Sequence, residues 1–322
     1  MNSSKYIVNK TFFYSVILLP VFFVYAYLLI IPYTEGDQEY YRIFYNALSD
    51  TNITEVMPLA LTKVASVEPV SIYVLWVGAS LGIDKDIFIS LLNIVLLLGL
   101  FLFCRKYEAG PIPTFLLLTN FYIIVLMTGA ERLKIAYIIL LWATFYTSNK
   151  ARLLIGISGL AHLQNIIMFP SLLLANYSNS IRRIFKAGKF KKELFLATII
   201  LLIFSAILFG VFNETIFKKV IGAMSRVDSS IIQILNLVIL TVVAIFATKN
   251  RWRMILLLLP MYPAVSILGG QRVNMIAVTL VIYFLATERM LNHPFVLFLL
   301  FYFSIKSIPF IYNILKYGTG FA

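Results

Sequence analysis

Four short polar segments interrupt an otherwise apolar chain, and they carry most of the side chains that could do chemistry. The first segment holds Asp37 and Glu39, followed directly by Tyr40 and Tyr41. A carboxylate here could accept a proton or bind sugar hydroxyls, and a tyrosine ring could stack on a sugar face. Asp37 and Glu39 could also hold a divalent ion, although two carboxylates alone are a weak metal signal. The pattern fits either a carbohydrate-binding site or an ordinary solvated loop.

Two further segments add cations and a histidine. Arg132 and Lys134 diverge if their segment is helical, and they converge on one phosphate only if it is a non-helical turn. His162 and Asn165 occur where an apolar run is broken, and their spacing puts them on one face of a helix. Each segment also has a structural interpretation, the first as an interfacial anchor and the second as a hydrogen-bonded helix break.

The fourth segment, Gly269–Asn274, has the residues of an anion site. Two glycines allow a tight backbone turn, and Arg272 then begins the next helix, whose dipole favours negative charge. A simple turn between two helices is the alternative. Lys218 and Arg226 lie in a separate loop whose apolar residues recur at helical spacing. That loop is typical of a helix on a membrane surface, either passive or able to capture an anionic lipid headgroup.

The composition decides what kind of structure must position these segments. The chain has 322 residues, of which 61% are hydrophobic and 13% charged, and its mean hydropathy is +0.91. This composition excludes a soluble globular domain, a disordered chain and a fibrous repeat. At roughly 20 residues per helical span, it predicts an all-α polytopic membrane bundle of about 10–12 spans. We expect a single transmembrane domain over residues 1–322, with spans at Thr11–Tyr33, Ile87–Phe103, Ile112–Thr128, Leu133–Thr147, Leu153–Leu160, Ile166–Asn176, Leu194–Phe212, Ile231–Thr248, Met254–Leu268, Val273–Ala286 and Pro294–Tyr312.

Two places depart from a simple crossing helix. The segment Pro69–Gly82 is apolar but too short to cross, so it predicts a re-entrant or interfacial helix in the first outer loop. The fifth and sixth apolar runs are also short, and the polar stretch His162–Asn165 separates them. They form either one broken helix or a tight hairpin.

The net charge of +13 follows membrane topology. With the N-terminus in the cytoplasm and one crossing per run, the inner segments hold 16 positive and three negative charges, whereas the outer segments hold 11 of each. This asymmetry obeys the positive-inside rule, so we expect basic clusters such as Arg182–Lys192 to anchor the topology and expect no nucleic-acid partner. The same orientation puts all four polar segments on the outer side.

The outer face therefore offers separated cations, a candidate base and a histidine. Almost no ionisable residue occurs at mid-span, where a cation channel would need a path of carboxylates. The single cysteine, Cys104, excludes an internal disulfide, and the first apolar run is too long for a cleavable signal. The set of polar groups suits a lipid-linked phosphate substrate better than ion transport.

The order of these features resembles the EpsG-like branch of the Wzy-type polysaccharide polymerases, which are bacterial multi-span glycosyltransferases of the broad GT-C type. The similarity covers about residues 30 to 285 and is closest over Ala151–Leu174. The chain lacks the arginine-rich pair of long outer loops found in some O-antigen polymerases. The residues that carry the resemblance are Gly36-x-x-x-x-Tyr41 with Asp37, then Glu68-Pro69, Arg132-x-x-x-Ala136, Ala161-His162 and Arg272.

The resemblance implies a membrane enzyme that joins oligosaccharide repeat units carried on undecaprenyl diphosphate. The reaction would occur on the outer face of the bacterial inner membrane, and its product would be an O-antigen, a capsule or an exopolysaccharide. No nucleotide sugar, cofactor or metal is implied. The expected partners are the lipid-linked glycan, membrane lipid, a chain-length regulator and a flippase.

The resemblance also suggests roles for the polar residues. Arg132 and Arg272 would stabilise the negative charge that grows on the leaving diphosphate. Asp37 would be the base that deprotonates the attacking hydroxyl, with His162 as the second choice. Substrate binding is expected from Tyr40, Tyr41, Glu68, Lys134, Gln164, Asn274, Lys218 and Arg226.

Other functions are alternatives at this point. A flippase or another permease would have a similar number of spans, but it would show two similar halves and a charged central cavity. A ligase that moves a finished glycan onto a lipid A core or a protein would use the same chemistry with another acceptor. A membrane acyltransferase fits less well, because the early spans contain no histidine.

Overall fold

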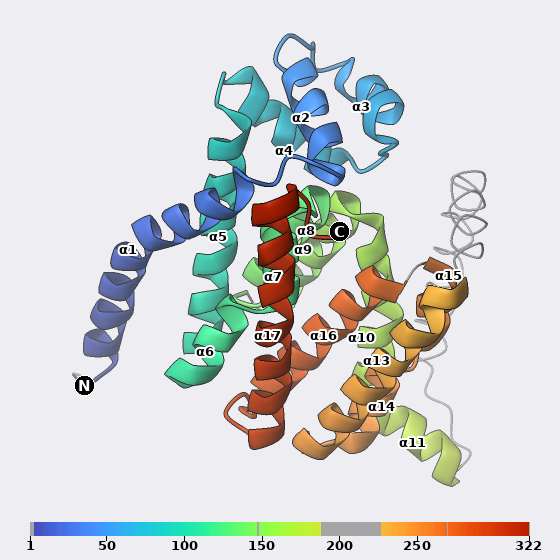
Figure 1. The fold of residues 1–322 in the computed structure, drawn as a ribbon. Helices are drawn as coiled ribbons and strands as arrows, with labels where there is room; N and C mark the ends of the chain where they lie inside the picture. Colours follow the sequence, from blue (N-terminus) through green and yellow to red (C-terminus); the bar gives the residue numbers. More distant parts are fainter. Residues whose placement is uncertain (1–2, 147, 188–226, 269, 322) are drawn as a thin grey trace. The chain divides into compact units, whose positions relative to one another are not determined.

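The protein is helical throughout the part that can be described. The computed structural model describes residues 3–146, 148–187, 227–268 and 270–321 (Figure 1). Of the described residues, 81% are helical and none forms a strand. The all-α fold class predicted from the apolar runs is therefore confirmed.

Several of the helices could span a membrane, as expected of a multi-pass membrane protein. Within the described residues, four are long and apolar enough to cross: α1 (Ser3–Ile30), α5 (Lys85–Lys106), α16 (Gly270–Thr287) and α17 (Pro294–Tyr317). Two bent helix pairs raise the number to six if each pair is one span. The prediction of about 10–12 spans stays untested, because other expected spans form shorter helices and the run Leu194–Phe212 lies outside the described residues.

The chain divides into two compact units. Unit 1 comprises residues 1–163 and 300–322, and unit 2 comprises residues 164–299. The boundary therefore falls inside the polar stretch His162–Asn165, directly after Leu163, and again within α17.

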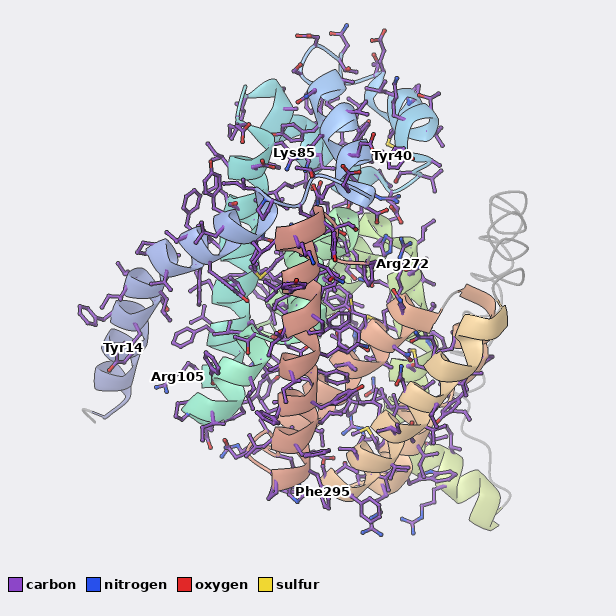
Figure 2. All side chains as sticks on the ribbon, in the orientation of Figure 1. Tyr14, Tyr40, Lys85, Arg105, Arg272 and Phe295 are labelled. Carbon is purple, nitrogen blue, oxygen red and sulfur yellow. The ribbon has the colours of Figure 1, made fainter. Side chains whose placement is uncertain are left out.

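Unit 1 is built on helices that run alternately up and down. At the start of α5, Lys85 forms an ion pair with Glu131, the first residue of α8 (Glu131–Ala143). At the other end of α5, Lys106 donates to the carbonyl of Thr144, just after α8. The two helices therefore run the same way, and α6 (Pro111–Leu118) with α7 (Phe121–Thr128) returns between them. Figure 2 shows Lys85 and Arg105 at opposite ends of α5.

The return helix is bent where its sequence carries a polar residue. The expected span Ile112–Thr128 consists of α6 and α7, which meet at an angle of 41°. The side chain of Asn120 caps α7 by accepting a hydrogen bond from the backbone nitrogen of Tyr122. On α17, Ser304 donates to the carbonyl of Leu116 and so fixes this helix against the bend.

Three short helices gather at the end of unit 1 where α5 begins (Figure 1). They are α2 (Asp37–Leu48), α3 (Val56–Val64) and α4 (Pro69–Ser80). Helices α3 and α4 meet at 104°, because the left-handed backbone of Ala65 ends α3 and Pro69 starts α4. Their shared core includes the fully buried side chains of Phe44 and Ile72.

The last helix of unit 1 ends at the first polar residue of a predicted break. Helix α9 (Ser148–Ala161) packs against α8 and stops directly before His162. A 3₁₀ turn, Leu163–Ile167, follows and leads into α10 (Met168–Asn176). The structure therefore confirms that the polar stretch separates two helices, whereas the choice between one broken helix and a tight hairpin stays a prediction, because α9 and α10 belong to different units.

Unit 2 contains the remaining helices of the described residues. These are α10, α11 (Ser178–Ala187), α13 (Val227–Ala247), α14 (Arg251–Leu258), α15 (Met261–Leu268) and α16. The expected span Met254–Leu268 is interrupted at Pro260, whose ring removes a backbone donor and so separates α14 from α15. Helix α16 packs against α13 and α15, and α10 packs against α14.

Candidate functional site

Glu68 is the centre of a buried polar cluster in unit 1, and its partners come from its own loop, from the start of α8 and from the residues after α9. One carboxylate oxygen, Oε2, accepts from Nη1 of Arg132 at 2.6 Å and from Oγ of Ser66 at 3.1 Å. The other, Oε1, lies 2.6 Å from Nδ1 of His162 and accepts from the backbone nitrogen of Leu163 at 3.3 Å. We call Tyr41, Glu68, Arg132 and His162 the open cluster.

The surroundings of Glu68 hold its carboxyl group in the ionised form. Burial alone would raise its pKa, but the hydrogen bond and charge of His162, together with the charge of Arg132, lower the pKa to about 2. Glu68 is therefore a poor proton acceptor. Its geometry suits a positioning role, in which one carboxylate orients a guanidinium and an imidazole at once.

Arg132 is the most accessible charged group in the open cluster. Its Nε donates to the hydroxyl of Tyr41 at 2.8 Å, and Nη1 is bound to Glu68, so the guanidinium is held from two sides. Its side chain keeps an exposed fraction of 17%, and among the described residues its Nη2 has no hydrogen-bond partner. An anion could therefore bind Arg132 without displacing Tyr41 or Glu68.

Tyr41 stays neutral in this cluster. Burial raises its pKa, an effect that the nearby charge of Arg132 only partly offsets. The phenol accepts a hydrogen bond from Arg132 and keeps its own proton.

One serine fixes the relative positions of the helices that carry the open cluster. Ser71, in the first turn of α4, lies with its Oγ 2.5 Å from the carbonyl oxygen of Ala161 and 3.2 Å from that of Arg132. The end of α9, which presents His162, and the start of α8, which presents Arg132, are thereby tied to one side chain. The sequence analysis did not single out Ser71, because nothing in its spacing distinguishes it from other helical serines.

A second ionic cluster adjoins the first and is closed to solvent. Lys85 Nζ lies 2.7 Å from Oε1 of Glu131 and donates to Oε1 of Gln38 at 2.5 Å. Gln38 in turn donates to the carbonyl of Thr128 at the end of α7. The side chains of Lys85 and Glu131 are only 4% and 1% exposed. We call Gln38, Lys85 and Glu131 the closed cluster; the sequence analysis missed the role of Lys85 and Gln38.

Lys134 does not fit the predicted substrate-binding role. Its side chain is fully buried, and its Nζ donates to the carbonyl of Met127 at 3.0 Å. Asn93 donates to the same oxygen at 3.0 Å. The last carbonyls of α7 are thus satisfied by polar side chains, and a cation is favourable at this helix end. Because Glu131 begins a regular helix, Arg132 and Lys134 diverge and cannot share one phosphate as the non-helical alternative required.

The other predicted residues of unit 1 lie at its surface. Asp37 is exposed as the first residue of α2, one helical turn before Tyr41. Tyr40, labelled in Figure 2, is 61% exposed, whereas Tyr41 is buried, so the two tyrosines point in different directions. Of these residues, only Tyr41 belongs to the open cluster, through its hydrogen bond from Arg132.

The predicted residues of unit 2 occupy different environments. Arg272 is exposed near the start of α16. Asn274 is buried, and its Nδ2 donates to the backbone and side-chain oxygens of Gln233 at 3.1 and 2.8 Å, which ties α16 to α13. Gln164 is half-buried in the 3₁₀ turn. The predicted residues Lys218 and Arg226 lie outside the described residues, and the expected meeting of Arg132 with Arg272 stays a prediction, because the two belong to different units.

The described side chains that could bind a metal ion are not grouped into a site. In residues 3–146, 148–187, 227–268 and 270–321, no three His, Cys, Asp or Glu side chains are grouped so that they could hold an ion. No protein-family model matches the chain, and no curated protein or solved structure matches it either. The assignment of a function therefore rests on the open cluster.

Proposed function

We propose that this protein is a membrane glycosyltransferase of the GT-C type that polymerises oligosaccharide repeat units carried on undecaprenyl diphosphate. The observation that supports the proposal is the open cluster itself. Tyr41, Glu68, Arg132 and His162 come from four separate segments and share one hydrogen-bonded arrangement with an accessible guanidinium. In the proposed orientation, the cluster faces the outside of the bacterial inner membrane, and α4 is the re-entrant or interfacial helix beside it.

The proposed reaction needs few groups from the protein. A hydroxyl oxygen of the acceptor glycan attacks the anomeric carbon of the donor, and the bond from that carbon to the diphosphate oxygen breaks. The diphosphate leaves with the electron pair, and the hydroxyl proton passes to a base. Because diphosphate is already a good leaving group, the largest gain comes from cations near its developing charge.

Arg132 would bind the diphosphate of the donor. Tyr41 and Glu68 hold the guanidinium in place, so little of its conformational freedom has to be lost when the substrate binds. Arg272 is proposed as a second cation. Its exposed position near a helix start suits an anion, but this part of the proposal depends on how the two units meet.

His162 is the better supported of the two candidate bases. Its imidazole contacts the ionised Glu68, which orients the ring and stabilises the imidazolium formed on proton transfer. Asp37 is exposed to solvent, and its carboxylate has no such orienting partner among the hydrogen bonds of the described residues. The resemblance suggested Asp37 as the first choice of base and His162 as the second. We therefore reverse this preference and assign the base role to His162.

Reconstitution of the full chain in lipid nanodiscs with a synthetic lipid-linked repeat unit tests the proposal. A polymerase gives a ladder of products that differ by one repeat, and Arg132→Ala abolishes the ladder. A single new conjugate would indicate a ligase instead. No product in nanodiscs, together with movement of the lipid-linked repeat across the membrane of proteoliposomes, would indicate a flippase. Activity that persists in a strong chelator would dismiss Asp37 and Glu39 as ion ligands.

A further inference from the structure

The segment that follows α17 reaches back to the loop that precedes α2. The backbone nitrogens of Thr34 and Glu35 both donate to the carbonyl of Gly318, at 3.0 and 2.8 Å. Gly318 has a φ of +68°, and a Cβ at this position would lie 2.6 Å from Oγ1 of Thr34. Only glycine suits both the backbone conformation and this close approach.

Aromatic packing holds the same segment on the body of unit 1. The ring of Phe321 packs edge-on against Phe310, with 5.0 Å between the ring centroids. Phe310 packs in the same way against Phe121 at the start of α7, at 5.4 Å. A Cβ at Gly320 would lie only 2.1 Å from the ring of Phe310, so the chain must pass close to this ring. The segment is thereby docked between α7 and the loop before α2.

Tyr33 connects this docked segment to the turn that presents Arg132. The side chain is buried, and the side chain of Thr319 and the backbone of Gly320 lie within hydrogen-bonding reach of its hydroxyl. The ring lies against Gly129, where an added Cβ would be 3.2 Å from the Tyr33 hydroxyl oxygen and 3.3 Å from Cε1.

Gly129 belongs to the short connection from α7 to α8. The backbone nitrogens of Gly129 and Ala130 both donate to the carbonyl of Val125, and Arg132 follows two residues later. A shift of the Tyr33 ring would therefore move the start of α8, which carries both Glu131 and Arg132.

We propose that Tyr33 is a positioning residue for Arg132, and that Thr319 and Gly320 fix its hydroxyl so that the ring sets the α7–α8 turn. The importance of this placement for catalysis rests on the proposed glycosyltransferase function. The effect of Tyr33 on the α7–α8 turn involves unit 1 alone and can be tested without any substrate.

The first arm of the test measures backbone hydrogen exchange in nanodiscs, for a peptide that covers residues 128–134. Thr319→Val and Tyr33→Phe each remove the hydroxyl contact while keeping the shape of the side chain. We expect exchange in this peptide to become at least about threefold faster in both variants, because the turn opens more often. The matched controls are Thr62→Val and Tyr14→Phe, which change exposed side chains on α3 and α1. Thr319→Ser keeps a hydroxyl and should restore slow exchange.

The second arm measures formation of the product ladder by the same proteins. Thr319→Val and Tyr33→Phe should lower turnover about tenfold at saturating substrate and change KM less than about twofold, because misplacement of Arg132 costs transition-state stabilisation. Thr319→Ser should restore turnover.

The two arms separate failure of the placement from failure of the function. Exchange that is unchanged relative to the controls overturns the placement, whatever the activity. Faster exchange with unaltered turnover overturns the role in catalysis. If the wild type makes no ladder, the proposed function fails, while the exchange data still decide whether Tyr33 sets the turn.

Discussion

Two neighbouring residues, Glu131 and Arg132, belong to two ionic clusters with opposite character. Glu131 pairs with Lys85 in the closed cluster, where both side chains are at most 4% exposed. Arg132 pairs with Glu68 in the open cluster, where the guanidinium is 17% exposed and is held from two sides. A charge that is buried and fully enclosed can only stabilise or specify the fold, whereas a charge that is positioned and still accessible can bind a ligand.

The two clusters differ because Glu131 and Glu68 have different numbers and kinds of partners. Glu131 has one cationic partner, and Lys85 is shared with Gln38, so this cluster joins the starts of α2, α5 and α8. Glu68 accepts from Arg132, Ser66 and the backbone of Leu163 and also contacts His162. Its charge therefore organises two side chains that can act on a substrate. We infer that the closed cluster supports the fold and that the open cluster supports the chemistry.

Replacement of Arg132 should have the largest effect. We expect Arg132→Ala to lower the rate of repeat-unit polymerisation about 100-fold to 1,000-fold, as for removal of other transition-state donors. The thermal unfolding midpoint in detergent should fall less than in Lys85→Met, because Ser66, Leu163 and His162 still contact Glu68 when Arg132 is removed. A ladder of normal length and rate from Arg132→Ala would place the reactive site elsewhere.

Breaking the closed cluster should act on stability instead. Lys85→Met leaves Glu131 buried without its cation, which costs about 3–5 kcal/mol of unfolding free energy. Thermal unfolding and the yield of folded protein measure this loss. The double variant Lys85→Met with Glu131→Leu removes both charges and should recover most of the stability. If the single and double variants lost the same unfolding free energy, the unpaired charge of Glu131 would not be the cause of the loss.

Lys134→Met tests whether Arg132 or Lys134 is the functional cation at the start of α8. Its ammonium contacts only the end of α7 in our account, so activity per folded molecule should stay within about twofold of the wild type. Arg132→Lys, which also keeps a long side chain, should lose at least about tenfold because lysine cannot hold Tyr41 and Glu68 in a fork. If Lys134→Met abolished activity and Arg132→Lys did not, the assignment of the two cations would be reversed.

The smallest predicted effect is a pH dependence of stability. The folded-state pKa of Glu68, about 2, lies below its usual value of 4.5. Its contribution to stability is therefore present above about pH 4.5 and is lost as the pH falls towards 2. We expect the unfolding midpoint of the wild type to fall across this window more than that of Glu68→Gln. If the unfolding midpoints of the wild type and of Glu68→Gln fell in parallel across this pH window, Glu68 would not be held ionised by its neighbours.

Local patterns in the sequence predicted the fold class and the segments of the open cluster. Apolar runs gave the helices, and the polar break at His162 and the Glu68-Pro69 pair marked real helix boundaries. The direction of Tyr41 could also have been predicted. It shares a helical face with Phe44, Tyr45 and Leu48, all of them buried, whereas Tyr40 lies about 100° away around α2.

Long-range pairing could not be predicted in this way. Lys85 and Glu131 are 46 residues apart, and nothing in either local sequence indicates that they meet. Lys134 looked like a phosphate ligand because its side chain type is cationic. The register of α8 decides that it points at the end of α7 instead. Helix register and the choice of partner are set by packing between distant segments, which a single sequence does not display.

The central claim is that the substrate diphosphate binds on the Arg132 side of α8 and not on the Glu131 side. Binding of undecaprenyl diphosphate to the full chain in nanodiscs, measured for matched variants, tests it most directly. We predict that Arg132→Ala weakens binding at least about tenfold, whereas Lys85→Met with Glu131→Leu binds as tightly as the wild type. Equal affinity in all three proteins, or a loss confined to the double variant, would contradict the account.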